Sequence, residues 1–185
     1  MIDRMVQFMK IDIIHGDIFN TACDAYVNPT DVRLSGSSGL DRIVHIKGGK
    51  ALEQECTALQ GKLRSGDTQI TTAGDLPVKY ILHTACPKCS EESGKEYSLL
   101  ANCYKNILYA SSNKSDIHHL ALPLVGTGNC GYSFDRPNYA DTNFSLTAVT
   151  ILSTILRIRF SHLHRISIVC SSKEKYDVMR RTFRW

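Results

Sequence analysis

The segment Leu34-Ser-Gly-Ser-Ser-Gly-Leu-Asp-Arg-Ile-Val-His45 decides the fold, because a glycine- and serine-rich loop runs directly into residues with helical apolar spacing. The free N–H groups and the positive dipole end of a starting helix form an anion site. Glycines let the backbone approach a phosphate that a Cβ would keep away. The segment therefore predicts either an anion-binding loop or an ordinary strand-to-helix turn.

Asp41 falls in the first turn of this expected helix, and its role has two readings. An acid there complements the helix dipole. Beside a bound phosphate the same acid would be repelled, so its presence would need a chemical reason such as proton transfer.

Composition sets the class of protein. The chain has 185 residues, of which 43% are hydrophobic and 22% charged, which is typical of one soluble globular domain spanning residues 1–185. Its formal net charge of +4 suits anionic ligands but falls short of a nucleic-acid footprint. We therefore expect a monomer that contacts neither a membrane nor nucleic acid.

The seven cysteines lie mostly inside apolar runs, as Cys23, Cys56, Cys103 and Cys170 do. This placement favours buried thiols in a reducing compartment. The sequence shows no signal peptide and no apolar run of membrane-spanning length. An intracellular location, cytoplasmic or nuclear, is the expectation.

Strands alternate with helices along the chain. Apolar patterning predicts strands at 10–15, 24–28, 68–72, 79–84, 119–125 and 165–170, and helices at 41–46, 50–62, 97–112, 139–159 and 173–183. Pro29 is expected to end the second strand, and Gly48-Gly49 the first helix. This order predicts an α/β fold with a largely parallel sheet.

In open α/β sheets, ligands bind outside the carboxyl ends of the strands. Three loops there contain chemically suggestive residues, namely 16–18, 28–41 and 126–132. Two of them are glycine-rich and each follows a strand, so together they could hold the two phosphates of a diphosphate.

Five segments in order resemble the macro domain family: Gly16-Asp-Ile18, Asp24-Ala-Tyr-Val-Asn28, Leu34 to His45, Leu76 to Thr84, and Leu122 to Gly128. The resemblance runs from about Lys10 to Tyr176. It implies a three-layer α/β/α domain with a mixed, largely parallel sheet that binds ADP-ribose. Many members hydrolyse ADP-ribose from proteins or cleave O-acetyl-ADP-ribose, and this chain resembles that enzymatic branch with diverged ligand loops.

The resemblance also implies roles for single residues. Asp17 would receive the adenine amino group, with the Ile18 backbone beside it. Asn28 and Asp41 would be the catalytic pair, Asn28 as the first asparagine of an Asn-x-x-Asn motif. Asp31 stands in the place of the second asparagine. The other ligand-binding residues implied are Gly36, Ser37, Ser38, Gly39, Leu40, Gly126, Thr127, Gly128, Asn129, Cys130, Gly131, Tyr132 and Ser171.

Three departures from the family pattern have physical consequences. Asp31 and Asp41 would put two carboxylates near one diphosphate, so one must be protonated or turned to solvent. Ser37 and Ser38 replace glycines, and either donate hydroxyls or block close approach. Ser171 stands where an aromatic residue often supports adenine, and losing a stack costs about 1–3 kcal/mol, or ten- to hundredfold in affinity. Tyr132 or Tyr176 are candidate replacements for that stack.

Other polar residues favour structural roles. His45 and His83 lie in apolar strings and are expected to be hydrogen-bonded core residues. Cys86-Pro-Lys-Cys89 has half of a zinc motif without the second half, so no metal and no cofactor are predicted.

Three functions remain open. The chain binds ADP-ribose or a related adenine diphosphate nucleotide and hydrolyses ADP-ribose from proteins or O-acetyl-ADP-ribose; or it reads ADP-ribosylated proteins or a free nucleotide signal without catalysis; or it is a degenerate protein-interaction module. Turnover separates the first from the second, and nucleotide binding separates both from the third.

Overall fold

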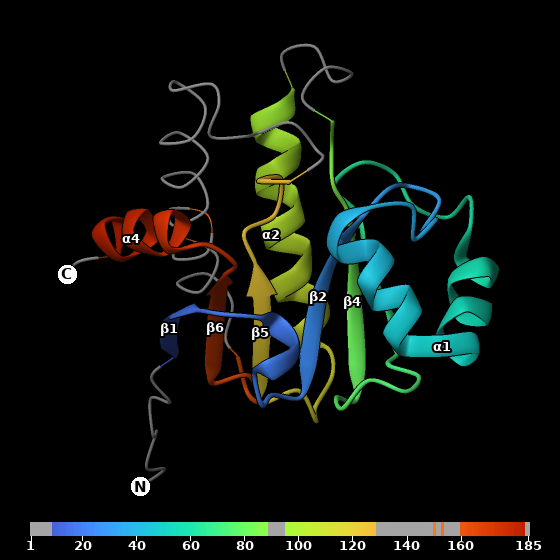
Figure 1. Cartoon of the computed structure of the whole chain (residues 1–185), viewed down its shortest axis with the longest axis horizontal. Helices are drawn as coiled ribbons and strands as arrows, with labels where there is room; N and C mark the ends of the chain where they lie inside the picture. Colours follow the sequence, from blue (N-terminus) through green and yellow to red (C-terminus); the bar gives the residue numbers. More distant parts are fainter. Residues whose placement is uncertain (1–8, 89–94, 129–149, 151–152, 154–159, 184–185) are drawn as a thin grey trace, which may run out of the picture.

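A computed structural model describes residues 9–88, 95–128, 150, 153 and 160–183. Its centre is a six-stranded sheet in the order β1-β6-β5-β2-β4-β3 (Figure 1). The strands are β1 Lys10–His15, β2 Ala25–Thr30, β3 Thr68–Thr72, β4 Tyr80–Ala85, β5 His119–Pro123 and β6 Arg165–Cys170. β3 pairs antiparallel with β4, and the other described pairs are parallel, so the mixed, largely parallel sheet is confirmed.

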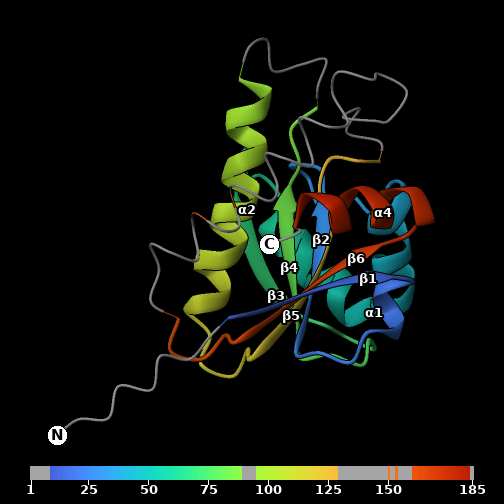
Figure 2. The same cartoon turned by 90° about the vertical axis from the view of Figure 1, so that its left-hand side faces the viewer.

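Helices cover both faces of this sheet. α2 (Glu96–Ser112) lies on one side and α1 (Gly39–Leu59) on the other (Figure 2). A short 3-10 turn, η1 (Ile18–Asn20), follows β1, and α4 (Lys173–Thr182) follows β6. Most of the helix expected at 139–159 and the chain start at 1–8 lie outside the described residues.

Each face has its own apolar core. Leu100, Tyr104 and Ile107 of α2 are buried in one cluster with alternate residues of β4, β5 and β6. Val44 and Leu52 of α1 belong to the other cluster, with the opposite faces of the same strands. Strands that contribute to both clusters must be apolar on both faces, which explains the continuous apolar run at 119–125.

At Pro29 and at Gly48-Gly49 the structure differs from the ends of elements that the sequence predicts. β2 continues through Pro29, contrary to the prediction, because β5 pairs with β2 only at Ala25 and Tyr26 and requires no N–H from Pro29. The break at Gly48-Gly49 is a kink inside α1, where Gly49 has φ 69°. Cys56 and Cys170 are buried as expected.

None of the helices in the described ranges is both long and apolar enough to cross a membrane.

Candidate functional site

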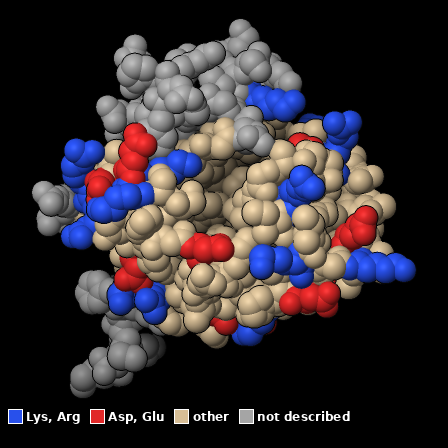
Figure 3. All heavy atoms as spheres, in the orientation of Figure 1, with Lys and Arg blue, Asp and Glu red and all other residues tan. Residues whose placement is uncertain are grey.

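A cleft of about 1150 Å³ opens at the carboxyl ends of the strands. It is bordered by the loop after β1, the loop and first turn that connect β2 to α1, and the loops that follow β5 and β6. Figure 3 shows the hollow among mainly uncharged side chains, with lysine and arginine at its rim. The lining includes these residues expected from the sequence: Asp17, Ile18, Asp31, Ser37, Ser38, Gly39, Leu40, Asp41, Gly126, Thr127, Gly128 and Ser171.

The first turn of α1 forms one wall of the cleft. Ser38 is the N-cap residue in extended conformation, and its side chain makes no capping hydrogen bond. Gly39, Leu40 and Asp41 form the first turn, where backbone N–H groups have no partner within the helix. These donors and the serine hydroxyls give the wall the polarity that an anion requires.

Asp41 is buried at this wall and is held from behind by the sheet. The Asn28 amide donates from Nδ2 to Asp41 Oδ1 at 2.7 Å and lies 3.1 Å from His83 Nδ1. Asn28 is fully buried and is not part of the cleft lining, so it acts on a ligand only through Asp41. His83 is fully buried and hydrogen-bonded, which confirms the expected core histidine.

Burial raises the pKa of Asp41 above its ordinary value, although the Asn28 amide and the His45 charge oppose that rise. His45 Nε2 lies 3.7 Å from Asp41 Oδ1, one helical turn along α1. The raised pKa brings the carboxyl closer to the range in which it can exchange a proton near neutral pH.

Asp31 lies in a different environment from Asp41. Its Oδ1 accepts from the backbone N–H groups of Arg33 and Ser35, at 2.7 and 3.3 Å, and its Oδ2 accepts from the Ser35 hydroxyl. Burial alone would raise the pKa of Asp31, but these hydrogen bonds hold it below its ordinary value. The two carboxyls that sequence reasoning set in competition are therefore separated: Asp31 is the acidic one, and Asp41 the one that retains its proton to higher pH.

Two further loops border the cleft, one after β1 and one after β5. Asp17 is exposed and caps η1, accepting from the Phe19 N–H at 3.0 Å. In the loop after β5, Gly126 has φ 87° and the Thr127 hydroxyl donates to the Leu124 carbonyl. The remaining expected residues of this loop, Asn129, Cys130, Gly131 and Tyr132, lie outside the described residues.

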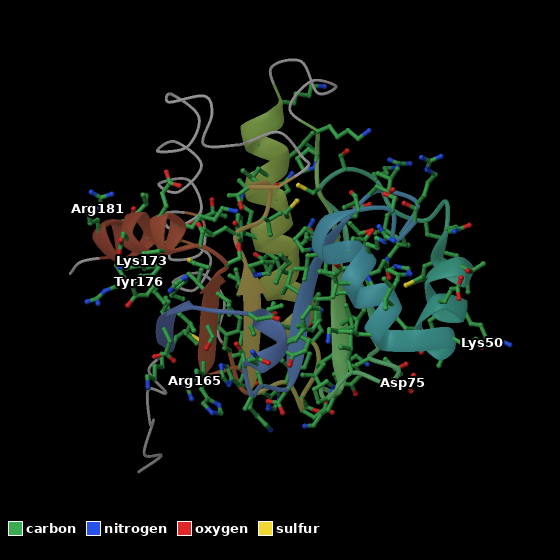
Figure 4. The ribbon with its side chains drawn as sticks, viewed as in Figure 1. Lys50, Asp75, Arg165, Lys173, Tyr176 and Arg181 are labelled. Atoms are coloured by element: carbon green, nitrogen blue, oxygen red, sulfur yellow. The ribbon has the colours of Figure 1, made fainter. Side chains whose placement is uncertain are left out.

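Two expectations need correction. Gly36 does not line the cleft; it has φ 60°, and a Cβ there would lie 2.7 Å from the His45 ring, so glycine serves loop packing. Tyr176 does not line it either: it lies on α4 (Figure 4), with its ring 5.9 Å from that of His15. Tyr176, one of the two candidates for the stack under a ligand base, therefore packs against β1 instead.

Sequence reasoning missed the basic residues of the lining, which are Arg33, Lys47, Lys88 and Lys175. Lys47 lies over the Phe19 ring, 5.2 Å from its centroid, and Lys175 is half-buried with a lowered pKa because of that burial. Single lysines in polar segments have no distinguishing pattern, so only the fold could bring them together. Among the described residues, no group of three or more His, Cys, Asp or Glu side chains is placed to hold a metal ion.

Comparisons with known proteins agree with this geometry. The model of the family described as "Macro domain" matches residues 27–138. O-acetyl-ADP-ribose deacetylase 1 of Pantoea vagans is 30% identical over 175 residues, covering 91% of this chain and 95% of the relative. The Oceanobacillus iheyensis macrodomain with ADP superposes with a TM-score of 0.82 at 24% identity, over 93% of this chain and 88% of that one. The Trypanosoma brucei macrodomain in complex with ADP-ribose gives 0.79 at 22%, over 92% and 68%.

Proposed function

The chain belongs to the macro domain family, and we propose that its cleft binds ADP-ribose or a related adenine diphosphate nucleotide and hydrolyses a bond at the distal ribose. The observation that supports hydrolysis is the carboxyl of Asp41, which is buried beside the first turn of α1 and has a raised pKa. Relatives of this family named O-acetyl-ADP-ribose deacetylase and solved macrodomains with ADP or ADP-ribose favour the same ligand class.

The ligand would lie across the cleft in one direction. Adenine would reach Asp17, whose carboxylate accepts a hydrogen bond from an exocyclic amine. The diphosphate would lie between the first turn of α1 and the loop that begins at Gly126, where backbone N–H groups supply donors. The distal ribose would then lie against Asp41. A cleft of about 1150 Å³ is large enough for a nucleotide of this size.

In the hydrolytic step, Asp41 acts as a general base. With an ADP-ribosylated protein, its carboxylate takes a proton from a water molecule whose oxygen forms a bond to the anomeric carbon, while the bond from that carbon to the leaving group breaks. With O-acetyl-ADP-ribose, the water oxygen instead forms a bond to the acetyl carbonyl carbon, and the bond from that carbon to the ribose oxygen breaks. The leaving group departs with the bonding electron pair, and the diphosphate anchored by the two loops keeps the sugar in place. Asn28 contributes by holding Asp41, since its amide lies behind that carboxyl.

Calorimetric titration with ADP-ribose, with AMP and NAD as comparisons, tests binding. Micromolar affinity for ADP-ribose and weaker binding of the other two is the expected result. Hydrolysis is then tested with O-acetyl-ADP-ribose and with a mono-ADP-ribosylated protein, on the wild type and on Asp41→Asn. Binding without turnover in the wild type would refute the enzyme and leave the reader of ADP-ribosylated proteins. No heat with ADP-ribose would refute both.

A further inference from the structure

His83 lies behind the cleft and joins three elements of the fold. Its Nδ1 is 3.1 Å from the Asn28 amide nitrogen on β2, and its Nε2 is 2.9 Å from the Thr71 hydroxyl on β3. The Cys56 thiol of α1 is a more distant neighbour, 3.8 Å from Nε2. The imidazole is fully buried. The contacts form one continuous chain from Thr71 through His83 and Asn28 to Asp41.

The donors and acceptors of this chain fix the histidine tautomer. The amide NH₂ of Asn28 can only donate, so the Nδ1 atom that faces it must be the acceptor. The proton of the neutral ring is then on Nε2, where it is donated to the Thr71 hydroxyl. Burial, with a smaller contribution from the His45 charge, lowers the pKa of His83 to about 3, so the ring stays neutral at ordinary pH.

Asn28 has two N–H bonds, and the structure gives each an acceptor. One points to Asp41 Oδ1 and the other to His83 Nδ1. Turning the amide by 180° would place its carbonyl oxygen against the Asp41 carboxylate oxygen, where two acceptors repel each other. The side-chain oxygen of Asn28, Oδ1, is buried and makes no hydrogen bond within the described part of the chain. The orientation is thus held entirely from the NH₂ side.

We propose that His83 is a positioning residue that holds the Asn28 amide toward Asp41 and so keeps the reactive carboxyl in place at the cleft wall. What Asp41 does chemically rests on the proposed function, but where it is held does not. His83 is not part of the cleft lining, so we expect it to influence a ligand through Asn28 and Asp41.

Several groups face Asp41 besides this amide. From β2 come Asn28 and the Thr30 hydroxyl, from α1 comes His45, and the loop before α1 contributes the charge of Asp31. Burial and the Asp31 charge raise the pKa of Asp41, while the other groups lower it. Releasing the Asn28 amide weakens one of the opposing contacts and leaves the burial unchanged. The pKa of Asp41 should therefore rise further when His83 loses its acceptor.

Two substitutions of nearly equal shape isolate this contact. In His83→Asn a side-chain oxygen takes the place of Nδ1 and still accepts from Asn28. In His83→Leu the same branched shape has no acceptor. Both variants lose the bond to Thr71, so both share that structural cost. They differ in the acceptor that faces Asn28 and in the NH₂ group that asparagine has on its other branch.

The measurement is a titration of the Asp41 carboxyl carbon by NMR in the ligand-free proteins, assigned from the spectrum of Asp41→Asn. We expect the pKa of Asp41 to rise by about 1 in His83→Leu and to stay within about 0.3 of the wild type in His83→Asn. Equal titration of the two variants would overturn the proposal. This readout needs neither ligand nor turnover, so failure to bind ADP-ribose refutes the proposed function and leaves the positioning role to the titration.

Turnover adds a second readout where the wild type is active. His83→Leu should lose about ten- to hundredfold in kcat with KM within about twofold, and His83→Asn should recover most of that loss. If His83→Leu does not fold, the wild type still decides the matter through ¹⁵N NMR of its imidazole. Nε2–H with unprotonated Nδ1 supports the proposal, and a proton on Nδ1 overturns it.

Discussion

Replacing His83 with asparagine should remove a large part of the acid sensitivity of this fold. In the folded chain the pKa of His83 is about 3, because the ring is buried, whereas an unfolded chain protonates it near 6.5. Below pH 6.5 the unfolded state therefore binds a proton that the folded state does not. Stability contributed by this group is complete above pH 6.5 and is lost as the pH falls toward 3.

The size of the effect follows from these two values. Between pH 7 and pH 5 the wild type should lose about 2 kcal/mol through His83 alone, and roughly 4–5 kcal/mol by the time the pH reaches 3. His83→Asn has no titrating group there and should start lower at pH 7, because its bond to Thr71 is gone and a cavity remains. The difference in the free energy of unfolding between the two proteins should then be smaller at pH 5 than at pH 7 by about 2 kcal/mol.

Urea denaturation at half-unit steps from pH 7.5 to pH 5 measures both proteins under the same conditions. The free energy of unfolding of the wild type should fall more steeply with decreasing pH than that of the variant. Parallel curves would show that His83 is protonated equally in the folded and unfolded chains, which would refute the neutral buried ring and the tautomer inferred from it.

Three further substitutions test the cleft and the loop that leads to it. Asp41→Asn should lose at least about a hundredfold in turnover. At pH 7 it should nevertheless unfold at a higher urea concentration than the wild type, because the raised pKa of Asp41 means that the wild type loses stability as this carboxyl ionises. The free energies of unfolding of the two proteins should converge near pH 4. Gly36→Ala should lower the free energy of unfolding by about 1–2 kcal/mol because of its positive φ, and further because the new Cβ would contact His45. Gly61→Ala is the control: its φ is 76° and the space around it is open, so only the loss due to φ is expected. Equal losses of the two variants in chemical denaturation would contradict this reasoning. Asp31→Asn should tighten ADP-ribose binding about fivefold in calorimetry by removing a charge near the diphosphate; weaker binding would mean that the loop needs the carboxylate.

The elements of the fold could be predicted because each has a local signal. The strands at 68–72 and 165–170 have the predicted bounds, since β-branched residues and flanking turns define them. The course of β2 through Pro29 could not be predicted, because it depends on where the neighbouring strand stops pairing. Local sequence identifies a proline, but only the sheet shows whether its missing N–H is needed.

The lining of the cleft was predictable where it comes from one continuous segment. Gly39 to Asp41 form the first turn of a helix at the strand ends, preceded by Ser37 and the N-cap Ser38, and that placement followed from loop composition and fold class. The basic lining was not predictable, since Lys47, Lys88 and Lys175 come from three separate segments. The partner of Asn28 was also hidden, because a histidine in an apolar strand gives no sign of which neighbour it bonds.

Asp31 stands in the place of an asparagine of the family motif, and this departure spoke most strongly against the expected function. The surroundings of Asp31 explain how the cleft accommodates the acid. Three donors from Arg33 and Ser35 surround the Asp31 carboxylate and stabilise its ionised form within its own loop. Asp41 accepts a hydrogen bond of 2.7 Å from Asn28, but its burial outweighs this contact, so its pKa moves the opposite way. The two acids therefore have different environments: Asp31 holds its loop through hydrogen bonds, and Asp41 has the raised pKa that proton transfer requires.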